Sequence, residues 1–137
     1  MISKHIITTT VLFLSSVVFL LAQDSTGKKV SGPLLKFDDT KQNFGFVRET
    51  EMVQLVYKYE NKGNAPVLIS EVKVTCGCTV VTYPKMIKPG EKGVFKVNFD
   101  TTGKIDRQDR TVTIISNSAN SPQELRFKGV VLKRKGT

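Results

Sequence analysis

Apolar and polar side chains alternate with a period of two residues over much of this sequence. Between Met52 and Glu60 the alternation places Val53, Leu55, Tyr57 and Tyr59 on one face and Gln54, Lys58 and Glu60 on the other. It recurs at residues 93–99, 110–116 and 125–131, and further apolar runs cover 67–74 and 80–83. A period of two is typical of a half-buried β-strand, whereas the apolar side chains of an amphipathic helix recur about every 3.6 residues.

Short segments rich in Gly, Pro, Asn and Ser separate these runs, at residues 60–64, 88–91, 101–104 and 116–122. Turn residues at such intervals between short alternating strands are typical of a β-sandwich. The sequence therefore predicts an all-β chain folded as an immunoglobulin-like β-sandwich of about seven strands. The side chains expected to meet between its two sheets are Leu55, Tyr57, Ile69, Phe95, Val97, Val112, Ile114 and Phe127.

The N-terminal segment has the layout of a secretory signal peptide. Lys4 and His5 precede an apolar stretch at residues 11–21, and the small residue Ala22 offers a cleavage point. The stretch is shorter than the roughly 20 apolar residues of a transmembrane helix. Leu20, two positions before the cleavage point, is larger than the residue usual there, so an uncleaved membrane anchor is the alternative. We expect a signal peptide at 1–22, a flexible leader at 23–33, the sandwich at 34–132 and a basic tail at 133–137, in the periplasm, the outer envelope or the extracellular space.

The two cysteines of the chain lie in one short motif, Cys76-Gly77-Cys78, between two predicted strands. In an oxidising compartment paired cysteines tend to form disulfides, and Gly77 is the residue that would let the backbone bend enough to close this one. Three interpretations stay open. The motif can be a structural turn whose cysteines are buried or bridged and have no redox role, or a disulfide that is readily reduced. It can also be a copper(I) site to which Met86 or Met52 adds a thioether ligand.

The inventory of side chains argues against catalysis. His5 is the only histidine and lies in the predicted signal peptide, so the mature chain has no imidazole for a general base or a His-containing zinc site. Asp38 and Asp39 are adjacent and are predicted to be turn residues at a strand end, and residues 106–110 are predicted to form a solvated charged loop. We therefore expect no enzyme activity and no cofactor.

The chain is basic, with 21 Lys and Arg residues against 12 Asp and Glu residues and a formal net charge of +9. No aromatic platform is interleaved with these cations, which argues against nucleic acid as a partner. The expected partner is an envelope protein or glycan, with attraction to anionic envelope surfaces, and the protein is expected to be a monomer.

Several short motifs together resemble one known bacterial family. They are Phe37-Asp38, Asn43-Phe44-Gly45 with Val47, residues 57–63, residues 66–69, Cys76-Gly77-Cys78-Thr79, Tyr83-Pro84, residues 87–91 and residues 127–130. The sequence is similar in these motifs to the secreted family named domain of unknown function 1573, over about Phe37 to Val131. The resemblance implies an immunoglobulin-like sandwich related to the ASH, major-sperm-protein and PapD-like group, whose members mostly serve as binding or scaffolding modules.

These observations favour a secreted envelope binding or assembly module without catalytic activity. The alternative function is that of a thiol-redox or copper(I)-handling protein acting through Cys76 and Cys78. If the protein is a binding module, binding is expected at an exposed strand edge or at the loop ends rather than in a deep pocket.

Overall fold

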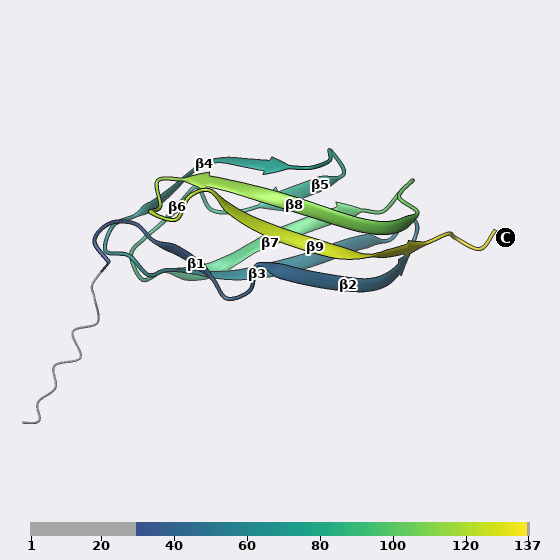
Figure 1. Ribbon diagram of the computed structural model, residues 1–137, viewed down its shortest axis with the longest axis horizontal. Helices are drawn as coiled ribbons and strands as arrows, with labels where there is room; N and C mark the ends of the chain where they lie inside the picture. Colours follow the sequence, from purple (N-terminus) through teal and green to yellow (C-terminus); the bar gives the residue numbers. More distant parts are fainter. Residues whose placement is uncertain (1–29, 137) are drawn as a thin grey trace, which may run out of the picture.

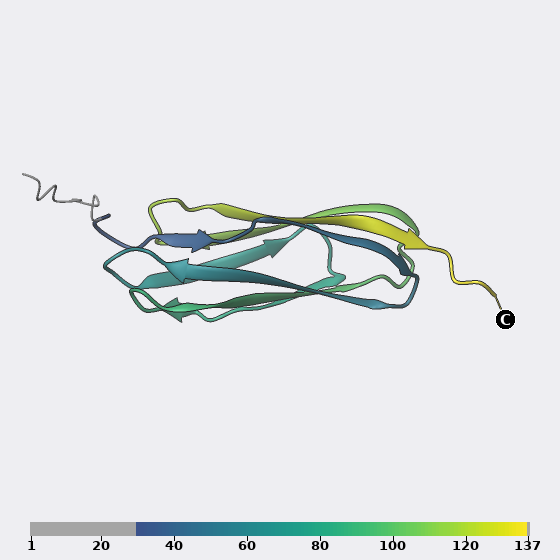
Figure 2. The same cartoon turned by 90° about the horizontal axis from the view of Figure 1, so that it is seen from below.

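The computed structural model describes residues 30–136. The predicted signal peptide, most of the predicted leader and the last residue of the predicted tail lie outside the described residues. Two β-sheets pack face to face along the whole length of the described domain (Figures 1 and 2). This confirms the prediction of an all-β immunoglobulin-like sandwich. Within residues 30–136 there is no helix long and apolar enough to cross a membrane.

The first sheet has four strands in the order β1-β3-β7-β5, and all its neighbours are antiparallel. Its strands are β1 (Leu35–Phe37), β3 (Met52–Asn61), β7 (Lys92–Asp100) and β5 (Thr79–Thr82). The second sheet has five strands in the order β2-β9-β8-β4-β6. Its strands are β2 (Lys41–Arg48), β9 (Gln123–Leu132), β8 (Asp106–Ser116), β4 (Val67–Val74) and β6 (Met86–Ile87).

Strand β2 is the exception to the antiparallel arrangement, because it runs parallel to β9.

The described residues contain nine strands, whereas the sequence predicted about seven. The surplus arises because β1 and β6 have only three and two residues, which is too short for an alternating pattern to be visible in a sequence.

The core lies between the sheets, and every side chain predicted to belong to it is buried. Those eight are Leu55, Tyr57, Ile69, Phe95, Val97, Val112, Ile114 and Phe127. Phe95 has no exposed surface, and its ring centroid lies 5.3 Å from that of Phe37, 5.4 Å from that of Tyr59 and 5.6 Å from that of Tyr83. Tyr57 is also fully buried, and its hydroxyl donates a hydrogen bond to the carbonyl oxygen of Arg126 across the sandwich, at 3.0 Å. Burial raises the pKa of Tyr57 far above its ordinary value.

A buried polar side chain, Asn61, fixes the loops at one end of the domain. Its amide nitrogen donates to the carbonyl oxygens of Ala65 at 2.9 Å and Ile87 at 3.1 Å. Its amide oxygen accepts hydrogen bonds from the backbone nitrogens of Leu34 at 3.3 Å and Gly63 at 3.0 Å. These four bonds satisfy backbone groups of three separate segments, which explains how a polar side chain that is 1% exposed is tolerated in the interior.

The prediction of a charged loop at residues 106–110 is wrong. Strand β8 begins at Asp106 and pairs with β9 from that residue onward. The alternation was hidden because the inward positions of this stretch hold Gln108, which is 5% exposed, and the half-buried Arg110 in place of apolar side chains. Asp38 and Asp39 lie where they were predicted, in the turn between β1 and β2.

Candidate functional site

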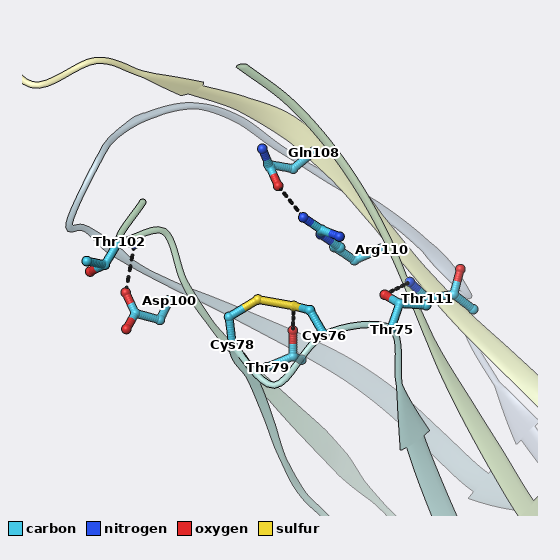
Figure 3. Close-up of a disulfide and its surroundings, with 9 residues drawn as sticks. All are labelled: Thr75, Cys76, Cys78, Thr79, Asp100, Thr102, Gln108, Arg110 and Thr111. Carbon is cyan, nitrogen blue, oxygen red and sulfur yellow. Dashed lines mark hydrogen bonds between the residues drawn. A yellow bond between two sulfur atoms is a disulfide. The ribbon is translucent and has the colours of Figure 1, made fainter. Parts of the chain in front are cut away.

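The Cys-Gly-Cys motif forms the connection from β4 in the five-stranded sheet to β5 in the four-stranded sheet. It therefore crosses from one layer of the sandwich to the other, at the same end of the domain as the C-terminus (Figure 1). Cys76 and Cys78 are joined by a disulfide with an S–S distance of 1.97 Å and a Cα–Cα distance of 5.3 Å (Figure 3). Both side chains are half-buried and pack against the core, whereas Gly77 is exposed.

Hydrogen bonds hold this connection on both sides. Thr75 continues the ladder with β8, since its backbone nitrogen donates to the carbonyl oxygen of Thr111 at 3.3 Å. On the other side the backbone nitrogen of Asp100, at the end of β7, donates to the carbonyl oxygen of Cys78 at 2.9 Å. The Thr79 hydroxyl lies 3.5 Å from the Cys76 sulfur. The disulfide is thus placed between the middle of β8 and the end of β7.

The methionines considered as copper ligands are not brought to the cysteines. Met86 pairs with Leu68 at the beginning of β4, whereas Cys76 follows the end of that strand, so eight residues at about 3.3 Å each separate the two levels. Met52 lies on β3, which β7 separates from β5. Among the described residues no group of three or more His, Cys, Asp or Glu side chains is arranged to hold a metal ion.

A second candidate site is the outer face of β2, β9 and β8, which we call the β2–β9 face. The register of the three strands places its side chains in rows across the sheet. They are Lys41 and Arg126; Asn43, Lys128 and Asp109; and Phe46, Val130 and Arg107. An open groove of about 340 Å³ runs over the last two rows, and a second of about 310 Å³ runs over the first two.

Phe46 is the most exposed apolar side chain of this face. A β-bulge interrupts β2 between Asn43 and Gly45, and Gly45 adopts a φ of +72°, in the left-handed region that favours glycine. The bulge turns Phe44 inward, against Phe99 and Phe127. Phe46 consequently faces solvent with 75% of its surface exposed.

The electrostatics of the β2–β9 face are mainly positive. Asp109 is the acidic side chain in its rows, and its carboxylate accepts hydrogen bonds from the Arg126 guanidinium, one of them at 2.7 Å from Nε. This contact lowers the pKa of Asp109 and raises that of Arg126. Because Asp109 is bound to Arg126, the charges of Lys41, Arg107 and Lys128 are not neutralised by an ion pair within the described residues.

Comparison with known families identifies the domain. The model of the family described as a protein of unknown function, DUF1573, matches residues 35–131. The chain belongs to this family. The DUF1573 match spans every strand except the last residue of β9. No curated protein matches the sequence.

Solved structures share the fold of this DUF1573 domain at low sequence identity. A protein of unknown function from Porphyromonas gingivalis W83 superposes with a TM-score of 0.64 and 15% identity, over 74% of this chain and 48% of that one. The secreted serine protease VesC from Vibrio cholerae gives 0.57 and 13%, over 75% of this chain and 24% of that one. The ASH / PapD-like domain 7 of human CEP192 gives 0.54 and 13%, over 74% and 87%.

These likenesses establish the fold alone. The chain spans about half of the Porphyromonas gingivalis protein and a quarter of VesC.

The rows of the β2–β9 face and the inward position of Arg110 were missed in the sequence, because cross-strand register brings together residues from β2, β8 and β9 that are far apart along the chain. The one local signal for the exposed face was the glycine between two phenylalanines, which is typical of a bulge.

Proposed function

We propose that this DUF1573 protein is a non-catalytic binding module of the bacterial envelope that holds an anionic glycan on its β2–β9 face. The exposed side chain of Phe46, set among cations beside an open groove, is the observation that carries the proposal. The secretory layout of residues 1–22 supports the location.

The energetics favour burial of Phe46 by a partner. Covering a fully exposed Phe side chain contributes roughly 1.5 to 3 kcal/mol, and aromatic side chains are enriched at interfaces. Asn43 and Lys128 lie in the adjacent row and can donate hydrogen bonds to the same ligand. A flat ring flanked by donors suits a sugar ring better than a large apolar protein surface, because the groove is open and charged and amide side chains line it together with Phe46 and Val130.

The charges of the face select a negatively charged partner. Lys41, Arg107 and Lys128 lie in three successive rows, so they can contact carboxylate or phosphate groups spaced along a polymer. Strand addition at the β2 edge is the less favourable mode. The bulge at Asn43 and Gly45 and the flanking charge of Lys41 are devices that discourage edge pairing.

The test is a titration of the purified protein with an acidic polysaccharide, compared with the same polysaccharide after its carboxylates are esterified. We expect binding to the acidic form alone, weakening as salt is added. Phe46→Ser and Lys128→Glu should each weaken it by about tenfold or more, since 1.4 kcal/mol corresponds to about a factor of ten.

Matched control variants lie on the outer face of the other sheet. Val80→Ser changes an apolar side chain that is 63% exposed, and Lys96→Glu reverses an exposed charge on β7. Both should bind as the wild type does. Equal losses in the controls, or a wild-type protein that binds an acidic protein and no acidic polysaccharide, would contradict the glycan assignment.

A further inference from the structure

Arg110 is a charged side chain on the inner side of β8. It lies between Gln108, which is 5% exposed, and Val112, which is fully buried, on the face that points into the sandwich. Its Nη2 donates to the side-chain oxygen of Gln108 at 2.7 Å. Its Nε is buried and has no hydrogen-bond partner among the described residues. A buried donor of a charged group without an acceptor is unfavourable, so the site offers a vacant donor for an anion.

The register of β4 and β8 leads to the level of Arg110 where the chain leaves β4 for Cys76. Strands β4 and β8 are antiparallel, with Val74 opposite Val112. The next pair is Thr75 and Thr111, since the backbone nitrogen of Thr111 donates to the Thr75 hydroxyl at 3.3 Å. Continued by one more residue, past the end of β4, this register brings Cys76 to the level of Arg110. In Figure 3 the Arg110 side chain lies between Gln108 and the disulfide.

Cys78 lies in a different electrostatic environment. Its carbonyl oxygen accepts the backbone hydrogen bond of Asp100, whose side chain is drawn nearer to Cys78 than to Cys76 in Figure 3. Hydrogen bonds from Thr102 lower the pKa of Asp100, and Lys104 also favours its charged form. A cation at Cys76 and a carboxylate at Cys78 favour the thiolate form at the first sulfur and disfavour it at the second.

We propose that Cys76 and Cys78 form a thiol–disulfide exchange site that oxidises dithiols, with Arg110 positioned to stabilise the thiolate of Cys76. The site is separate from the β2–β9 face, so it stands whether or not that face binds a glycan. Thr79 assists, because its hydroxyl can donate a hydrogen bond to the same sulfur.

The exchange balances with a dithiol as co-reactant. One thiolate of the dithiol attacks the Cys78 sulfur, the bond between the two protein sulfurs breaks, and its electron pair leaves on Cys76 as a thiolate beside Arg110. The second thiol of the partner loses its proton to water and attacks the partner's own bonded sulfur, which releases Cys78 as a thiolate that takes a proton from water. Two electrons pass to the protein, and the dithiol becomes a disulfide.

The first test measures which reduced cysteine reacts. The purified protein is fully reduced, the reductant is removed, and limiting iodoacetamide is added over a pH series before peptide mass analysis. We expect Cys76 to be alkylated about tenfold faster than Cys78 at neutral pH, because a tenfold difference corresponds to about one pKa unit between two thiols. The rate at Cys76 should stay high at pH values where an ordinary thiol has become slow.

Variants at two positions separate a positioning role from a structural one. Arg110→Gln should remove the preference for Cys76 and shift the equilibrium with dithiothreitol about tenfold toward the protein disulfide, whereas Arg110→Lys should keep most of both effects. Asp100→Asn should accelerate alkylation of Cys78. Thermal unfolding of each variant shows whether it is folded.

Three results would overturn the proposal. One is freshly isolated wild-type protein with two free thiols, and another is equal alkylation of both cysteines with the pH profile of free cysteine. The third is a folded Arg110→Gln variant with an unchanged pH profile. If Arg110→Gln does not fold, Asp100→Asn decides, and an unchanged rate at Cys78 then counts against the site.

Discussion

Replacement of Phe95 by alanine removes the ring at the centre of the aromatic cluster. Phe95 has no exposed surface, and three other rings have their centroids within 5.6 Å of its own. Substitutions of buried Phe by Ala lower the free energy of unfolding by about 3 to 5 kcal/mol. The Phe95 site belongs in the middle of this range, at about 4 kcal/mol, because two hydrogen-bonded sheets fix its walls and limit their collapse.

Equilibrium urea unfolding followed by circular dichroism measures this change, which suits a sequence without tryptophan. The matched control is Phe46→Ala, which removes the same atoms from a side chain that is 75% exposed and should alter stability by less than about 0.5 kcal/mol. A loss below about 1 kcal/mol for Phe95→Ala, or an equal loss for both variants, would place Phe95 outside the core and refute the packing argument.

Three further changes have defined outcomes in the same unfolding assay. Asn61→Ala deletes the buried amide that makes four hydrogen bonds and should lower stability by at least about 2 kcal/mol; a change under about 0.5 kcal/mol would contradict its loop-fixing role. Gly129→Ala places a Cβ against the ring of Phe44 and should destabilise by about 1 to 3 kcal/mol, whereas a neutral result would mean that this ring moves aside freely. Because the pKa of Tyr57 is raised in the folded protein, the unfolded chain loses the phenol proton at a lower pH than the folded protein does. The free energy of unfolding should therefore be constant with respect to this group below pH 10.0 and fall above it. Tyr57→Phe should remove part of this alkaline loss of stability, and an identical pH dependence in the variant would contradict the assignment.

The strand interiors were predictable from the sequence because they obey a local rule. Alternation at Leu55, Tyr57, Phe95 and Val97 needs only the period of two and one buried face, and all four side chains are buried. The rule depends on apolar side chains at inward positions. It therefore failed at the start of β8, where Arg110 occupies such a position.

The functional geometry depends on long-range register, which a single sequence does not contain. Phe46 and Arg107 lie in one row, on either side of Val130, only because β2 and β8 both align with that residue of β9. The cysteine pair was visible in the sequence as chemistry, but its asymmetry was not, because the cation on one side and the carboxylate of Asp100 on the other come from two different sheets.

The parallel pairing of β2 with β9 has a consequence for how the chain folds. Near the beginning of the domain Lys41 pairs with Arg126, and the backbone oxygen of Leu35 accepts a hydrogen bond from Asn120, 85 positions away. Such separations raise the contact order, and sandwiches of this kind fold in milliseconds to seconds rather than microseconds. During synthesis β2 has no neighbour in its sheet until β9 has emerged. The domain therefore stays incomplete, with the position of β9 in the second sheet unfilled, until its final strand is made.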